Sequence, residues 1–131
     1  MGSFGNYIEN KFLDHIVGKT AYSRPTAYIA LSTADPLDDA SGMAEPSGNN
    51  YSRLITSGSD WNAASGGAID NATALTFATA TGSWGTITHF ALYDAVSGGN
   101  MLAHGSLASS QAVGNAETIK FAAGELDITL T

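Results

Sequence analysis

Three histidines, His15, His89 and His104, are the residues suited to acid–base chemistry near neutral pH, since the chain contains no cysteine. Catalysis or metal binding at a histidine requires carboxylates or further ligands that converge on it. His15 lies on or beside the apolar side of a predicted helix. His89 and His104 lie on two strands of a predicted hairpin and would face each other if its register allowed. No partner is spaced to converge on them, so we expect structural histidines and no metal or cofactor.

A serine-hydrolase arrangement can be drawn from Ser83, His89 and Asp94, which supply a nucleophile, a base and an acid. His89 and Asp94 are five residues apart, however, and residues at that separation on a strand point to opposite faces. The chain also lacks the Gly-x-Ser-x-Gly turn that exposes a catalytic serine. We therefore expect that the protein is not an enzyme.

The longest irregular segment, residues 33–50, is also the most acidic, because it contains Asp35, Asp38, Asp39 and Glu45. Carboxylate oxygens are ligands that Ca²⁺ prefers, but these four lack the alternate-residue spacing of an EF-hand loop. Solvated loop carboxylates are the favoured interpretation. A loop of this length inside a compact domain is usually functional or mobile.

Two further patterns have a structural and a functional interpretation. Trp61 and Trp84 are either buried anchors beside glycine-rich turns or a platform for a carbohydrate, and we favour the anchors. Residues 71–73 match the N-glycosylation sequon. That match has little meaning here, because residues 1–30 show no basic segment followed by an apolar run and hence no signal peptide.

The charge balance argues against two classes of partner. The chain has 5 Lys and Arg against 12 Asp and Glu, a net charge of −7, and only 13% charged residues. So few cations cannot follow a phosphate backbone or hold the chain on an anionic membrane, so we expect no nucleic-acid or membrane partner. No apolar run approaches the roughly 20 residues of a membrane span.

One helix is predicted over residues 4–17. Asn6 and Glu9 have the spacing of a capping box, and Gly18 stands where a helix ends. The apolar positions recur every three to four residues, which predicts a helix that docks on a sheet or on a neighbouring chain. The stripe consists of Tyr7, Ile8, Phe12, Ile16 and Val17.

The rest of the chain is predicted to be β-rich and to centre on a hairpin of residues 86–93 and 101–107. Strict alternation places Ile87, His89, Ala91 and Tyr93 on one face of the first strand. Neither face of that strand is clearly polar, so we expect the strand to be buried on both sides. Five further strands are predicted at residues 27–31, 51–56, 74–77, 117–121 and 125–131. This gives a single domain over 1–131, mainly β, with about seven short strands in a β-sandwich or jelly-roll-like fold. It consists of the 4–17 helix and a 27–131 β-domain with the long 33–50 loop.

Several segments, in this order, resemble one family of small proteins from tailed bacteriophages. They are residues 7–15, Tyr28-Ile-Ala-Leu-Ser-Thr-Ala-Asp-Pro36, residues 42–46 with 51–53, and Ala80-Thr-Gly-Ser-Trp-Gly-Thr-Ile-Thr-His-Phe-Ala-Leu-Tyr-Asp94. The similarity runs from about residue 5 to 131 and includes the turn at 121–124. Members of that family are described as tail-fibre-like, virion structural or capsid decoration (cement) proteins.

The resemblance implies a non-enzymatic virion component, made in the host bacterial cytoplasm and present as a homo-oligomer, a dimer or a trimer. Because the chain is short and shows no fibre repeats, we expect a cement protein on the capsid exterior that binds the major capsid protein. The alternative is a tail or tail-fibre-associated module, with receptor or glycan contact through the tryptophans. The residues expected to bind the partner are Phe12, Ile16, Asp35, Asp38, Asp39 and Glu45.

Overall fold

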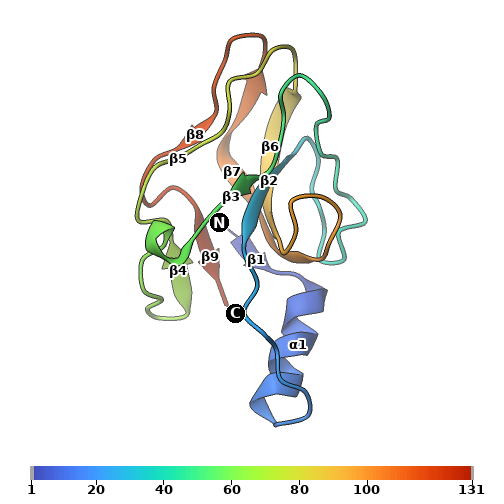
Figure 1. Ribbon diagram of the computed structural model, residues 1–131, viewed down its shortest axis with the longest axis vertical. Helices are drawn as coiled ribbons and strands as arrows, with labels where there is room; N and C mark the ends of the chain where they lie inside the picture. Colours follow the sequence, from blue (N-terminus) through green and yellow to red (C-terminus); the bar gives the residue numbers. More distant parts are fainter. Residues whose placement is uncertain (1, 131) are drawn as a thin grey trace.

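The computed structural model describes residues 2–130 and shows a mainly β fold with one helix (Figure 1). Seven strands form a curled sheet in the order β3-β2-β6-β7-β1-β9-β4, and β5 and β8 pair in a second sheet. The predicted β-rich class with an N-terminal helix is therefore confirmed. The elements are β1 (Gly2–Phe4), α1 (Asn6–Ile16), β2 (Tyr28–Ser32), β3 (Leu54–Ile55), the 3-10 turn η1 (Gly58–Asp60), β4 (Ala68–Asp70), β5 (Leu75–Thr76), β6 (Gly85–Tyr93), β7 (Met101–Val113), β8 (Lys120–Phe121) and β9 (Asp127–Thr129).

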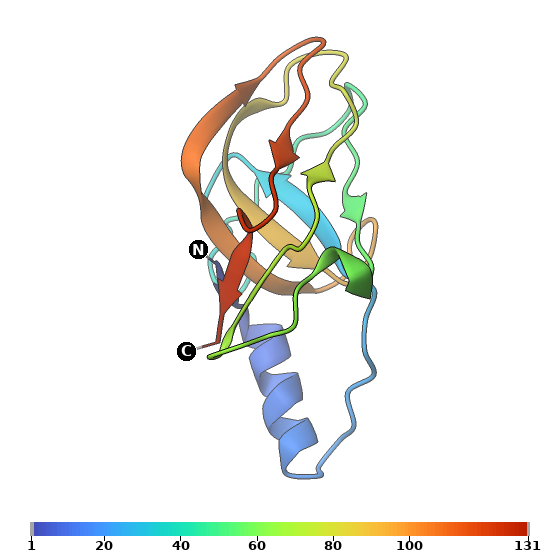
Figure 2. The ribbon, with the colours of Figure 1, turned by 90° about the vertical axis from the view of Figure 1, so that its left-hand side faces the viewer.

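The predicted hairpin is present as β6 and β7, which pair antiparallel. Residues 90–93 are all buried, so the carboxyl-terminal half of β6 is covered on both faces as expected. Phe90 and Leu92 enter the main core, whereas Tyr93 packs with Met101 in a smaller cluster on the other face. Strands β6 and β7 of the large sheet are strongly curved (Figure 2).

A register shift within the hairpin makes one prediction wrong. Ile87 pairs with Gln111, but His89 pairs with Ser106, so residues 107–110 of β7 lie opposite the single residue Thr88 of β6. Such a bulge breaks the strict alternation of side chains. Ile87 therefore lies in the main core with Phe90 and not on the face of Tyr93.

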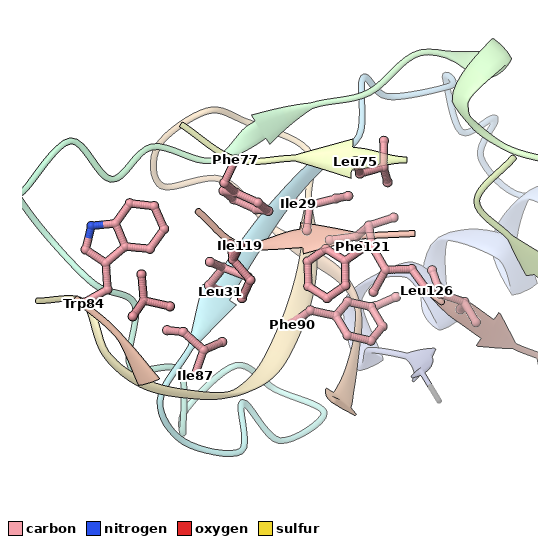
Figure 3. Close-up of a cluster of buried hydrophobic side chains, with 14 of the residues drawn as sticks. Ile29, Leu31, Leu75, Phe77, Trp84, Ile87, Phe90, Ile119, Phe121 and Leu126 are labelled. Atoms are coloured by element: carbon pink, nitrogen blue, oxygen red, sulfur yellow. The ribbon is translucent and has the colours of Figure 1, made fainter. Parts of the chain in front are cut away.

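The small second sheet closes the core from the opposite side (Figure 3). Its segments contribute Leu75, Phe77, Ile119 and Phe121, all of them buried. The rings of Phe77 and Phe121 meet edge to face, with centroids 6.3 Å apart. Facing them from the large sheet and its flanks are Ile29, Leu31, Trp84, Ile87, Phe90 and Leu126.

The large sheet includes two strands that the sequence pattern did not predict, β1 and β4. Each is three residues long, too short to show an alternating pattern. β1 lies between β7, to which it is antiparallel, and β9, to which it is parallel. β4 pairs only with the far edge of β9. In the other direction, the strand predicted at 51–56 is reduced to Leu54–Ile55.

Helix α1 spans Asn6–Ile16, close to the prediction, but the predicted capping box is wrong. Gly5 is the N-cap, without a side-chain cap. The first amides instead donate to other parts of the chain: Gly5 N–H to the Leu102 carbonyl and Asn6 N–H to the Asp38 carbonyl, both at 2.9 Å. Gly18 has a φ of +76°, as expected for a residue that ends a helix.

Candidate interaction surface

An apolar cavity of about 420 Å³ lies beneath the helix. Figure 2 shows α1 projecting from one end of the sheet, with the connector 17–27 returning beside it. The helix contributes Ile8, Phe12 and His15 to the cavity walls, and the connector contributes Tyr22 and Arg24. The remaining walls come from Phe4, Pro25, Ala27, Trp61, Ile69, Leu92, Leu102, Ala103 and Ile128.

Phe12 and Ile16, which we expect to act together in partner binding, occupy neighbouring positions on α1 but differ in burial. The Phe12 ring is half-buried and meets Phe4 and Tyr22 edge to face, with centroid distances of 5.4 and 6.0 Å. Ile16 is 76% exposed. Their role in partner binding stays a prediction.

In the acidic loop, residues 33–50, two aspartate carboxylates accept hydrogen bonds from backbone amides of the loop itself. An Oδ1 of Asp35 accepts the Leu37 N–H, and an Oδ1 of Asp39 accepts the Ser41 N–H, each at 3.0 Å. Hydrogen bonds from the side chain and backbone of Ser41 hold the pKa of Asp39 below its usual value. Each Asp therefore closes a tight turn and remains exposed.

Asp38 ties the same loop to the hairpin. Its Oδ1 lies 2.8 Å from Nε2 of His104, and Oδ1 of Asp35 lies 3.9 Å from Nδ1 of that ring. The ring is 13% exposed, whereas the side chains of Asp35 and Asp38 are 55% and 63% exposed. The mostly buried His104 thus holds the loop against the hairpin, while the side chains of Asp35 and Asp38 remain exposed to solvent.

Glu45 has a different environment from the three aspartates. Its two oxygens accept hydrogen bonds from Nε and Nη2 of Arg53, both at 2.9 Å, and the Tyr51 hydroxyl donates to Oε2 at 2.6 Å. The guanidinium also stacks on Tyr93, 3.9 Å from the ring centroid. Burial, together with the hydrogen bond to Glu45, raises the pKa of Tyr51 well above its ordinary value. Glu45 is therefore bound within the chain, and the expectation that it contacts a partner stays untested.

The residues considered for catalysis have separate partners. The Nδ1 of His15 accepts the Tyr22 N–H, and the ring of His89 bonds to Thr88. His89 and His104 are not opposite each other, because His89 pairs with Ser106 in the hairpin. Ser83 caps the Gly85 amide, while Asp94 binds Asn100. The three groups drawn as a triad are thus each engaged elsewhere.

Both tryptophans act as anchors in the structure. Trp84 is 4% exposed and its Nε1 donates to the Asn49 carbonyl at 2.9 Å. Trp61 is half-buried in the cavity wall, and its Nε1 donates to Thr56. Asn71 of the sequon is fully buried, with its amide bonded to three backbone groups, so it presents no acceptor for a glycan.

Residues 2–130 contain neither a metal-binding cluster nor a membrane-spanning helix. No group of three or more His, Asp or Glu side chains there is arranged to hold a metal ion. Within the same residues, no helix has both the length and the apolar character needed to cross a bilayer.

The fold and these surfaces define a small, mainly β structural protein whose polar groups mostly hold its own loops in place. The chain belongs to the family described as podophage GP4 fiber I protein gp80, whose model matches residues 3–129. This membership confirms the resemblance to small virion structural proteins of tailed phages. No curated protein matches the chain.

Proposed function

We propose that the chain is a non-enzymatic subunit of the phage tail fibre, or of the tail structure that the fibre joins. The family description supports this role better than the capsid cement role that the sequence alone favours. The observation that carries the proposal is the match of a fibre-protein family over 3–129. The absence of a converged catalytic group among the described residues agrees with it.

The surface that we assign to a neighbouring virion protein is the acidic loop, with Asp35, Asp38 and Asp39 as the contacting residues. All three carboxylates are exposed, lie within five positions of one another and are fixed by hydrogen bonds. A preformed acidic surface loses little conformational entropy on binding. The partner surface should be basic, because opposite potentials steer and orient the encounter.

Neutralising the three aspartates tests this assignment. In Asp35→Asn, Asp38→Asn and Asp39→Asn, the amide oxygens still accept the loop's hydrogen bonds, but three charges are lost. We expect weaker incorporation into particles, and binding of the wild type that falls with added salt. Incorporation of this triple variant at the wild-type level would contradict the assignment.

A matched control removes three charges elsewhere. Glu117 and Glu125 each accept one backbone N–H bond near a turn, and Oδ1 of Asp70 accepts a hydrogen bond from the side-chain amide of Asn62, so Asp70→Asn, Glu117→Gln and Glu125→Gln keep an oxygen acceptor in each place. We expect normal incorporation of this control. Cryo-EM of labelled particles tests the location separately, and label found only on the capsid shell would refute the tail role.

A further inference from the structure

The cavity beneath α1 is an open apolar site with one charged group at its edge. Ile8, Phe12 and His15 stand at spacings of four and three residues, so they share one helix face, and all three line the cavity. Arg24 reaches the cavity from the connector. Its guanidinium has no ion-pair or hydrogen-bond partner among residues 2–130. An occupant should therefore be apolar and carry an anionic group beside the apolar part.

The adjoining face of the same helix has that composition. Glu9, Leu13, Ile16 and Val17 follow at spacings of four, three and one residues. This outer stripe is turned by about 100° from the stripe that faces the cavity. Leu13, Ile16 and Val17 are 63%, 76% and 77% exposed. Contiguous large apolar side chains on the surface of a soluble protein commonly mark a contact site.

The charge on the outer stripe matches the charge at the cavity. The Glu9 carboxylate, like the Arg24 guanidinium, has no partner within the described chain. A helix that lays an apolar face into a groove is a common recognition mode, with anchors at this spacing. The cavity and the helix stripe are both apolar, and within the described residues each carries one unpaired charge of opposite sign, so they are complementary in polarity and in charge.

We propose that the outer stripe of one copy docks into the cavity of a second copy, with Glu9 of one protomer beside Arg24 of its partner. If the contact is reciprocal, it closes with twofold symmetry and covers both apolar surfaces of both chains. A small apolar ligand would fill the cavity but leave Leu13, Ile16 and Val17 in water. This inference goes beyond the proposed function, because it concerns pairing of the chain with itself and does not depend on its place in the virion.

Analytical ultracentrifugation of the purified chain tests the pairing. We expect the wild type to sediment with twice the chain mass of 13.4 kDa. Leu13→Lys with Val17→Lys should shift the equilibrium to monomer, with at least about a tenfold weaker association, because the charged ends cannot enter an apolar cavity. Circular dichroism should show an unchanged fold, since both side chains are exposed in the monomer. The control is Leu37→Lys with Val96→Lys, which alters two exposed apolar residues outside the outer stripe and the cavity and should leave the dimer intact.

A charge swap tests the orientation of the two copies. Glu9→Arg and Arg24→Glu should each weaken association, because each places like charges together at the contact. Combining them restores opposite charges and should restore association. A wild type that is monomeric at all concentrations would overturn the inference and leave the cavity to a small ligand or another protein. So would a dimer that is indifferent to the lysine variants, or one that the combined swap fails to restore.

Discussion

Replacing Arg53 with methionine removes the group that joins three separate segments of the chain. The guanidinium binds both oxygens of Glu45 and donates from Nη1 to the carbonyls of Ala95 and Gly98, at 2.9 and 2.8 Å. It therefore links the acidic loop, the segment before β3 and the turn of the hairpin. Methionine preserves much of the volume over Tyr93 but none of these bonds.

The size of the effect follows from the burial of the pair. The Arg53 side chain is 6% exposed and that of Glu45 is 24% exposed. Removing one member of a buried pair destabilises a protein by about 3–5 kcal/mol, and the partial exposure of Glu45 favours the lower end, about 3 kcal/mol. In urea unfolding with a slope of about 2 kcal/mol per molar, the midpoint should fall by about 1.5 M.

A double-mutant cycle separates the pair from its surroundings. Arg53→Met, Glu45→Gln and the double variant are compared in the same urea titration. The double variant should be less destabilised than the sum of the two single variants, because no charge is then left unpaired. A cost below about 1 kcal/mol for Arg53→Met would mean that the pair behaves like an exposed one. Additive single effects would likewise refute the reasoning.

Three further predictions concern stability. The pKa of Tyr51 is raised in the folded state, so the folded protein keeps a proton that the unfolded chain releases above pH about 10, and stability should fall above that pH. In urea titrations, Tyr51→Phe should reduce the dependence of the unfolding free energy on pH by up to about 1.4 kcal/mol per pH unit, and an unchanged dependence would be the contrary result. Asn71→Ala leaves three backbone groups without their hydrogen-bond partner and should lower the unfolding free energy by about 3 kcal/mol or more in chemical denaturation. Asn115→Ala, at an exposed position, should lower it by almost nothing, and equal losses would contradict the role of the buried amide. Phe12→Ala should cost about 2 kcal/mol, less than for a fully buried ring, and melting that does not change would show that α1 is not docked through this ring.

The parts of the fold predicted correctly are those with a local pattern. The helix has its apolar positions at helical spacing, and the hairpin strands are rich in β-branched and aromatic residues. The parts that were missed depend on distant partners. Nothing in Gly2–Phe4 indicates a strand until β7 and β9 are placed on either side of it. Likewise, the bulge opposite Thr88 that redirects Ile87 depends on the length of β7.

The candidate surface shows the same division. Sequence identifies the 33–50 segment as acidic, but it does not distinguish Asp39, which is exposed, from Glu45, which is bound by Arg53. One sequence feature points to the bound state of Glu45: Arg53, one of only 5 Lys and Arg in the chain, follows Tyr51 by two residues and Glu45 by eight. The cavity has no such signal, because its walls come from segments spread between Phe4 and Ile128.

The position of β9 between β1 and β4 also has a consequence for the order of folding during synthesis. Residues 2–4 are synthesised more than 120 residues before their neighbours on one side of β1, residues 127–129. Until they emerge, β4 has no neighbour in the large sheet and the cavity lacks Ile128. Closing a loop of this length is slow relative to forming the hairpin. Until residues 127–129 pair with β1, the helix therefore lies beside an incomplete sheet, so the large sheet forms late through contacts between distant segments.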